Sequence, residues 1–385
     1  MRERMSFEQE LSALARGTEV CRELQLGTAS ETRWGVCIGN LFATGAPSDG
    51  TVSDPEALAG GKPVVLHVRF YPGRVNESAL VFGGVHGNED EGVVVTKAIR
   101  SKLELAYGLG RKARYATFLI ENVRADRDLL DPSSKNARWV EGVEPNRNFP
   151  LPGEGLGLVT ARRKRLGFGL VDPDTRRFPD QAPRAPTTFP DVAASKDKDL
   201  KTDRTSKDLL AETRLLLKLV GCIQPTRAVS AHSHSISKKR GDAPGVFVDP
   251  RGGFDSDLDA PLTAEGRVDD ALADAVLRAA KTRIAASKLT VSQQREALAG
   301  NRMGITDYLG ETVHYSFGAR KARGTSFGMW APAPITGQPS DDRPGIQTLT
   351  LEMPKWLVST KLRPQVDELA GIWADAIIER FLEVK

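Results

Sequence analysis

Residues that could bind a metal ion or transfer a proton occur in four clusters, each close to the end of an apolar segment. The clusters are HGNE at 86–89, EPNRNFP at 144–150, AHSHS at 231–235 and LTLEMP at 349–354. An imidazole nitrogen and a carboxylate oxygen three residues apart, as in His86 and Glu89, can reach one zinc ion at about 2 Å. The alternative for this pair is an ordinary strand-to-helix turn in which Glu89 only interacts favourably with the helix dipole.

The residue types in the four clusters match what a hydrolytic zinc site requires. Two imidazoles and one carboxylate can bind the ion and leave a fourth position for water. A further carboxylate must take a proton from the water and pass it to the leaving amine. One guanidinium can stabilise the oxyanion, and a second can hold a substrate carboxylate through two hydrogen bonds. His232 and His234 would point to the same side of a strand, so spacing does not decide which of them is a ligand.

Short apolar runs alternate with runs of helical period, and these elements must position the clusters. The runs that predict strands are residues 20–26, 34–42, 64–70, 80–85, 116–120, 227–231, 245–248 and 345–352. The runs that predict helices are residues 5–16, 93–107, 209–220, 263–287 and 363–383. Residues 47–62 are rich in polar residues, glycine and proline, and are expected to form a loop. His67 lies inside a predicted strand, and we expect it to be structural.

Strands that alternate with helices indicate an α/β fold with a mixed, mostly parallel sheet and helices on both of its faces. We expect about eight strands and a single catalytic domain over residues 1–385. Residues 1–18 would form an N-terminal extension. Residues 151–208 are highly charged and poor in aromatic residues, which predicts a flexible insertion on the surface. Since the carboxyl ends of parallel strands meet at one edge, the four clusters should face a common crevice.

The composition argues against several other classes of protein. A formal charge of +4 over 385 residues does not indicate a nucleic-acid partner. No apolar run reaches the roughly 18 residues of a membrane span. The three cysteines are far apart in sequence, which suggests reduced thiols rather than a disulfide framework. The first residues lack the apolar core of a secretory signal, so we expect a cytoplasmic protein, with export without a leader left open.

The four clusters resemble, in the same order along the chain, the motifs of the zinc carboxypeptidase (funnelin) family. The matching motifs are HGNE, NRNFP, AHS and TLEMP, and an AET segment before the third motif also resembles a family feature. The resemblance implies one Zn²⁺ ion bound by His86, Glu89 and His232. It favours His232 as the third ligand, because the ligand histidine of the family directly precedes a serine or alanine at a strand end. His234 would then line the substrate pocket.

The same resemblance implies roles for the residues around the ion. Glu352 matches the family's general base and general acid, and Asn146 and Arg147 match the clamp for a substrate carboxylate. Arg138 is the expected oxyanion arginine, because related members place an arginine shortly before the segment that matches Asn146. Two further arginines are alternatives for that role: Arg124 and Arg127.

Two segments, GVFVDP at 245–250 and GTSFGMWA at 324–331, resemble the murein peptide amidase subgroup of this family. Members of that subgroup cut the γ-D-glutamyl–diaminopimelate bond of cell-wall peptides. We therefore expect a zinc metallopeptidase that hydrolyses an amide bond next to a free carboxylate in a peptide. The alternatives are a general metallocarboxypeptidase, an N-acyl amino acid deacylase of the aspartoacylase or succinylglutamate desuccinylase type, and a catalytically silent binding protein with the same fold.

Overall fold

The computed structural model describes residues 21–24, 34–38, 47–75, 77–130, 135, 138, 140, 145–150, 153–156, 209–234, 244–248, 251, 263–299, 326–338, 341–357 and 362–385. The expected N-terminal extension at 1–18 lies outside these residues. The expected insertion at 151–208 also lies outside them, apart from residues 153–156. The single-domain organisation stays a prediction.

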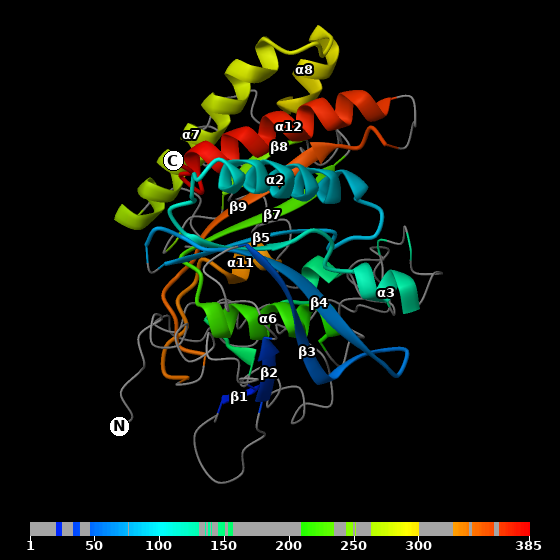
Figure 1. Cartoon of the computed structure of the whole chain (residues 1–385), viewed down its shortest axis with the longest axis vertical. Coiled ribbons are helices and arrows are strands. Elements are labelled where there is room, and N and C mark those ends of the chain that lie inside the picture. The colour runs from blue at the N-terminus through cyan, green and yellow to red at the C-terminus, as the bar shows by residue number, and fades with distance from the viewer. Residues whose placement is uncertain are drawn as a thin grey trace, which may run out of the picture.

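A sheet in the strand order β1-β2-β3-β4-β6-β5-β7-β9-β8 runs through the described part of the chain (Figure 1). Its strands are β1 (Cys21–Leu24), β2 (Trp34–Ile38), β3 (Ser48–Ala59), β4 (Lys62–Tyr71), β5 (Ser78–Gly83), β6 (Ala116–Ile120), β7 (Arg227–His234), β8 (Gly245–Val248) and β9 (Gln347–Pro354). The sheet confirms a mixed α/β fold. The expectation of a mostly parallel sheet is wrong. Among the strand pairs of the described residues, the three central ones, β6–β5, β5–β7 and β7–β9, are parallel. The five outer pairs are antiparallel.

Strand β3 replaces the loop that was expected at residues 47–62. It pairs antiparallel with β4 from Ser48 opposite Phe70 to Ala59 opposite Lys62, with an irregularity between Ser53 and Leu58. A proline at position 55 falls within this irregularity, where a residue without an N–H donor is tolerated. The polar composition of β3 gives it little intrinsic strand preference, so the pairing with β4 decides its conformation.

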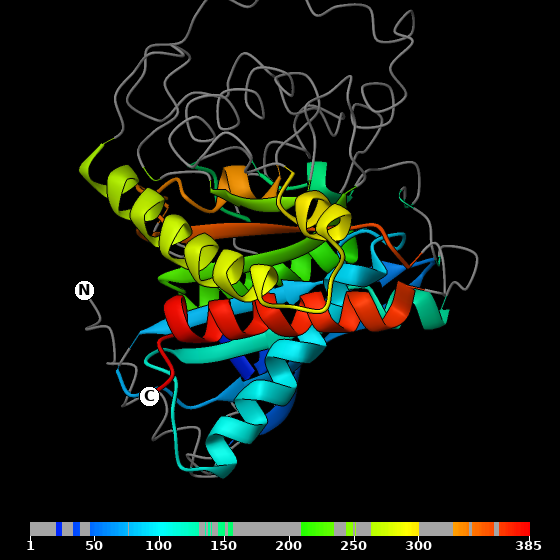
Figure 2. The same ribbon diagram turned by 90° about the horizontal axis from the view of Figure 1, so that it is seen from above.

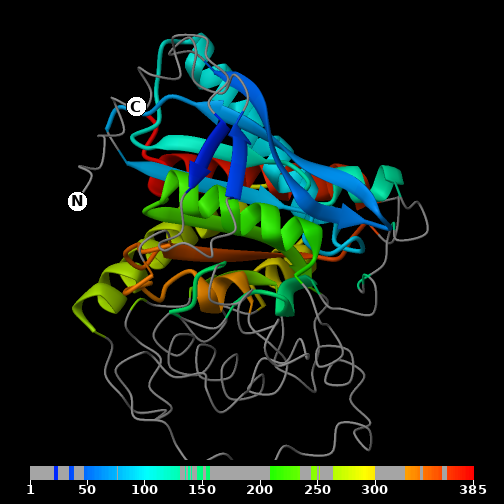
Figure 3. The same cartoon turned by 90° about the horizontal axis from the view of Figure 1, so that it is seen from below.

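Helices lie on two sides of the sheet. They are α2 (Asp90–Gly108), α3 (Ala125–Leu130), α6 (Ala211–Ile223), α7 (Ala264–Ala285), α8 (Val291–Ala297), α11 (Phe327–Trp330) and α12 (Arg363–Arg380), with a 3-10 turn η2 at Pro145–Arg147. Helices α2, α7 and α12 lie together on one side (Figure 2), and α6 lies on the other side (Figure 3). Within the residues described above, no helix combines the length and the apolar character needed to cross a bilayer.

Strand β5 shows why the centre of the sheet is apolar on both faces. Successive side chains of a strand point to opposite faces, and all of its residues from 78 to 83 are buried. Ala79 and Val81 belong to the hydrophobic cluster that contains α2 and α12. Leu80 and Phe82 belong to a second cluster that contains the apolar side of α6. A strand packed on both faces is held firmly, so the turn that follows it has a fixed position.

Candidate metal centre

The turn between β5 and α2 carries the first two candidate ligands. Gly84 has a φ of +74°, and a Cβ atom there would lie 2.2 Å from the side-chain oxygen of Asn122, so glycine is required. The backbone N–H of Glu89 donates to the carbonyl of His86 at 3.3 Å, which closes the turn. Glu89 is the N-cap residue of α2, but its side chain makes no capping hydrogen bond. Its carboxylate contacts two histidines, so Glu89 has partners beyond the favourable interaction with the helix dipole.

The parallel pairing of β5 with β7 brings the third candidate ligand to the same edge of the sheet. Gly83 lies opposite Ala231, and His232 follows directly. Helix α2 also lies close to this strand, since a Cβ atom on Gly92 would be 2.5 Å from the carbonyl oxygen of Ala231. Glycine at position 92 therefore allows the helix that begins after Glu89 to approach the strand that ends near His232.

His86, Glu89 and His232 form one compact group of metal-binding atoms. Their candidate donor atoms lie within 4.8 Å of one another. The Nδ1 atom of His86 is 2.9 Å from one carboxylate oxygen of Glu89, and the Nδ1 atom of His232 is 2.9 Å from the other. All three residues are buried, and the two ring centroids are 5.4 Å apart. Two imidazole nitrogens and a carboxylate suit a divalent ion of the first transition row, so the residues fit the expected metal.

The carboxylate of Glu89 is the electrostatic centre of this group. Burial by itself raises the pKa of the Glu89 carboxyl, but the two imidazoles outweigh it and hold the pKa well below its usual range. The guanidinium of Arg138 adds a contact of 3.1 Å to the oxygen that faces His86. The backbone N–H of Ser233 lies 3.4 Å from the other oxygen. Glu89 is therefore held ionised, which is the form that binds a metal ion.

The register of the sheet brings Glu352 next to His232, one of the three residues of the compact group. It is directly opposite His232 in the parallel pair β7–β9, and opposite Gly245 in the antiparallel pair β9–β8. Residues in register on neighbouring strands place their side chains on the same face. Glu352 is partly buried and is not one of the three residues of the compact group. The structure thus places a carboxylate beside the candidate ligands.

The three candidate oxyanion arginines have different surroundings. Arg138 is the one described in contact with the metal-binding group, and about one third of its side chain is exposed. Arg127 is buried and forms two contacts with the carboxylate of Glu212, one of them at 3.2 Å. Arg124 is buried and contacts Asp128 at 3.2 Å. Glu212 belongs to the AET segment, which opens α6, and its carboxylate binds Arg127 of α3.

The other predicted site residues, Asn146, Arg147 and His234, do not belong to the compact group. The side-chain oxygen of Asn146, in η2, accepts a hydrogen bond from the backbone N–H of Phe327 at 3.3 Å. The backbone of Arg147 belongs to the same turn, while its side chain lies outside the described part of the chain. His234 ends β7 opposite Pro354 and is only partly buried. It is not among the three residues of the compact group.

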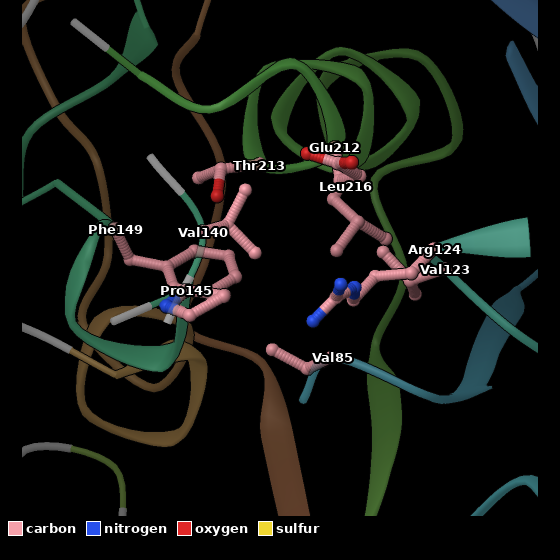
Figure 4. Close-up of a pocket in the computed structure, with 9 residues that line it drawn as sticks. All are labelled: Val85, Val123, Arg124, Val140, Pro145, Phe149, Glu212, Thr213 and Leu216. Atoms are coloured by element: carbon pink, nitrogen blue, oxygen red, sulfur yellow. The ribbon is translucent and has the colours of Figure 1, made fainter. Parts of the chain in front are cut away.

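A small pocket borders the site, and its walls come from the segments that carry the predicted residues (Figure 4). Val85 directly precedes His86, and Pro145 directly precedes Asn146. The pocket is lined by Val85, Val123, Arg124, Val140, Pro145, Phe149, Glu212, Thr213 and Leu216. Figure 4 shows the guanidinium of Arg124 extending into it between Val85 and Leu216. The lining of the pocket is thus mostly apolar, with a guanidinium, a carboxylate and a hydroxyl from Arg124, Glu212 and Thr213.

One neighbour of the group was missed by sequence reasoning. The hydroxyl of Ser230 lies 2.8 Å from the Nε2 atom of His232, and Ser230 is 1% exposed. Ser230 and His232 are two residues apart in a strand and therefore point to the same side. That spacing was a usable signal, but serine is too common in strands for the spacing alone to indicate a role.

No family model and no curated protein matches this chain. Among solved structures it is similar to a succinylglutamate desuccinylase/aspartoacylase of Rhodobacter sphaeroides, at 12% identity and a TM-score of 0.36, over 88% of this chain and 65% of that one. It is similar to the murein-tripeptide amidase of Escherichia coli O157, at 18% identity and a TM-score of 0.32, over 81% of this chain and 87% of that one. An aspartoacylase family protein of Mesorhizobium loti matches at 13% identity and a TM-score of 0.30, over 74% of this chain and 69% of that one.

Proposed function

We propose that the chain is a zinc-dependent hydrolase of an amide bond that lies next to a free carboxylate. One observation carries the proposal: His86, Glu89 and His232 bring their donor atoms within 4.8 Å of one another at the edge of the sheet where Glu352 lies. These residues come from three distant segments of the chain. A purely structural role for such a buried group would not require an additional carboxylate in register with one ligand.

In this mechanism the protein's own residues bind the ion, transfer a proton and stabilise charge. The two imidazoles and Glu89 would hold the ion, which when bound supplies a Lewis acid that polarises the scissile carbonyl and makes water more acidic. Glu352 would accept the proton of the attacking water and return it to the leaving amine. Arg138 would stabilise the negative charge that develops on the carbonyl oxygen, and its contact with Glu89 and its partial exposure support this role.

Substrate selection is assigned to the segment that contains Asn146 and Arg147. The hydrogen bond from Phe327 to the Asn146 oxygen fixes the orientation of that amide. An amide next to a guanidinium suits a carboxylate of the substrate. Cell-wall peptides of the γ-D-glutamyl–diaminopimelate type carry several carboxylates, and we take them as the leading substrate class. N-acyl amino acids and the carboxyl ends of ordinary peptides are the competing classes.

The test is hydrolysis of defined substrates by the zinc-loaded protein, read by mass spectrometry. The panel contains L-Ala-γ-D-Glu-diaminopimelate, N-succinylglutamate, N-acetylaspartate and a blocked dipeptide with a free carboxyl end. We expect release of diaminopimelate, its loss after treatment with a chelator, and its return when zinc is added. The matched control is Glu352→Gln, which should retain zinc and lose turnover.

The outcomes separate the alternatives. Cleavage of an N-acyl amino acid alone would identify a deacylase, and cleavage of the dipeptide alone would identify a general carboxypeptidase. Full zinc occupancy with no turnover of any substrate would support a silent binding protein and refute the proposed hydrolase. Turnover by Glu352→Gln equal to that of the wild type would refute the role of Glu352.

A further inference from the structure

The buried hydroxyl of Ser230 has a position that bears on metal binding. Its Oγ atom lies 2.8 Å from the Nε2 atom of His232, while the Nδ1 atom of the same ring lies 2.9 Å from Glu89. Both side chains of this hydrogen bond are almost fully buried, Ser230 at 1% exposure and His232 at 2%. Water therefore cannot easily replace either partner. Each nitrogen of the His232 ring thus faces one defined group of the protein.

A neutral imidazole carries its proton on only one of its two nitrogens, and the partner of the other nitrogen selects which one. Without an ion, Nδ1 can donate to the Glu89 carboxylate while Nε2 accepts from the Ser230 hydroxyl. With an ion at Nδ1, the proton must sit on Nε2, and Ser230 must accept it. A hydroxyl can both donate and accept, so Ser230 satisfies the ring in both states.

We propose that Ser230 is a positioning residue for the metal: it fixes the rotation of the His232 ring and stabilises the tautomer in which Nδ1 binds the ion. The inference rests on the proposed metal site and adds a residue to it. The loss of such an outer hydrogen bond in metalloproteins lowers metal affinity by about 10- to 100-fold. We therefore expect Ser230→Ala to bind zinc about 10- to 100-fold more weakly than the wild type.

The experiment measures zinc affinity directly, by competition with a chromogenic chelator, so that it does not depend on turnover. The matched control is Ser78→Ala in β5. Ser78 is also buried, at 3% exposure, and its hydroxyl donates to the carbonyl of Ile223 at 2.7 Å. It begins the strand whose other end leads to His86. Ser78→Ala removes one buried hydroxyl hydrogen bond as well, but it should leave zinc affinity at the wild-type value. Ser230→Thr, which keeps a hydroxyl, should restore the affinity.

A second measurement covers the case in which Ser230→Ala does not fold. In wild-type protein loaded with cadmium and labelled in its histidines, scalar coupling to the metal identifies the bound nitrogen. We expect coupling to Nδ1 of His232 and an Nε2 proton protected from exchange with solvent. Coupling to Nε2, or equal zinc affinity in Ser230→Ala and the wild type, would overturn the inference. Absence of zinc binding by the wild type is a separate result and would refute the proposed metal site itself.

Discussion

The buried ion pair between Arg127 and Glu212 allows a quantitative test of which arginine serves the reaction. The side chain of Arg127 is 2% exposed and that of Glu212 is 9% exposed, and two nitrogens of the guanidinium contact the two carboxylate oxygens. Removing one member of a buried pair leaves an uncompensated charge and costs about 3–5 kcal/mol. We therefore expect Arg127→Met and Glu212→Leu each to lower the free energy of unfolding by about 3–5 kcal/mol.

The double variant Arg127→Met/Glu212→Leu gives the coupling energy of the ion pair. Replacing both charges by apolar side chains of similar size is often close to neutral, so the double variant should lose no more than about 2 kcal/mol. The two single losses then exceed the loss of the double variant by several kcal/mol, and this difference is the coupling energy of the pair. The measurement is urea unfolding of the zinc-loaded proteins at neutral pH, followed by circular dichroism.

An exposed ion pair on the same protein serves as the control. Arg363 contacts Asp367 at 2.9 Å, and both side chains are more than half exposed. Arg363→Met should cost less than about 1 kcal/mol. The reasoning is refuted if Arg127→Met is as stable as the wild type while its turnover falls by about 10²–10³-fold, the effect of losing an oxyanion donor. That result would assign the oxyanion role to Arg127 rather than to Arg138.

Three further predictions concern the site and its scaffold. Glu352→Gln should lower kcat by about 10²–10⁴-fold through loss of proton transfer and leave zinc content unchanged, as measured by steady-state kinetics and elemental analysis; a loss of bound zinc would contradict this. Gly92→Ala should lower stability by about 1–3 kcal/mol, because its methyl group would meet the Ala231 carbonyl at 2.5 Å, whereas Gly108→Ala meets nothing within 4 Å and should not destabilise; thermal unfolding compares the two. In metal-free protein, the Glu89 pKa is lowered from its ordinary 4.5, so the unfolded chain binds more protons there. Stability from this carboxylate is then complete above pH 4.5 and is lost as the pH falls through the lower folded value. Glu89→Gln should reduce the loss of unfolding free energy at acid pH, as measured by urea unfolding at a series of pH values. An unchanged loss would disprove the contribution of Glu89.

The parts of the fold that the sequence predicted well are those with strong hydrophobic periodicity. Strand β6 was expected at residues 116–120, and these are its bounds in the structure. The helix expected at 93–107 is α2, which begins three residues earlier at Asp90. Elements buried on one or two faces leave a regular apolar pattern, so periodicity identifies them. The chemistry-bearing clusters follow such elements, and for that reason the sequence could predict that His86, Glu89 and His232 lie close together.

The features that were missed depend on partners far away in the sequence. Strand β3 has a loop-like composition, and its pairing with β2 and β4 makes it a strand. The contact of Arg127 with Glu212 joins residues 85 positions apart, and no local pattern indicates it. Local sequence gives conformational preference, but it does not report which distant groups neutralise a buried charge.

The register between β7 and β9 has a consequence for the durability of the site. His232 and Glu352 lie directly opposite each other on the neighbouring strands β7 and β9, so main-chain hydrogen bonds determine how far the imidazole is from the acid. A slip of β9 by one residue would separate them, and it would also turn the buried Leu349 and Leu351 out of the interior. The packing of these leucines thus maintains the spacing between His232 and Glu352. The pair should already be aligned in newly folded, ion-free protein, and peripheral loops can change in length or sequence without disturbing it.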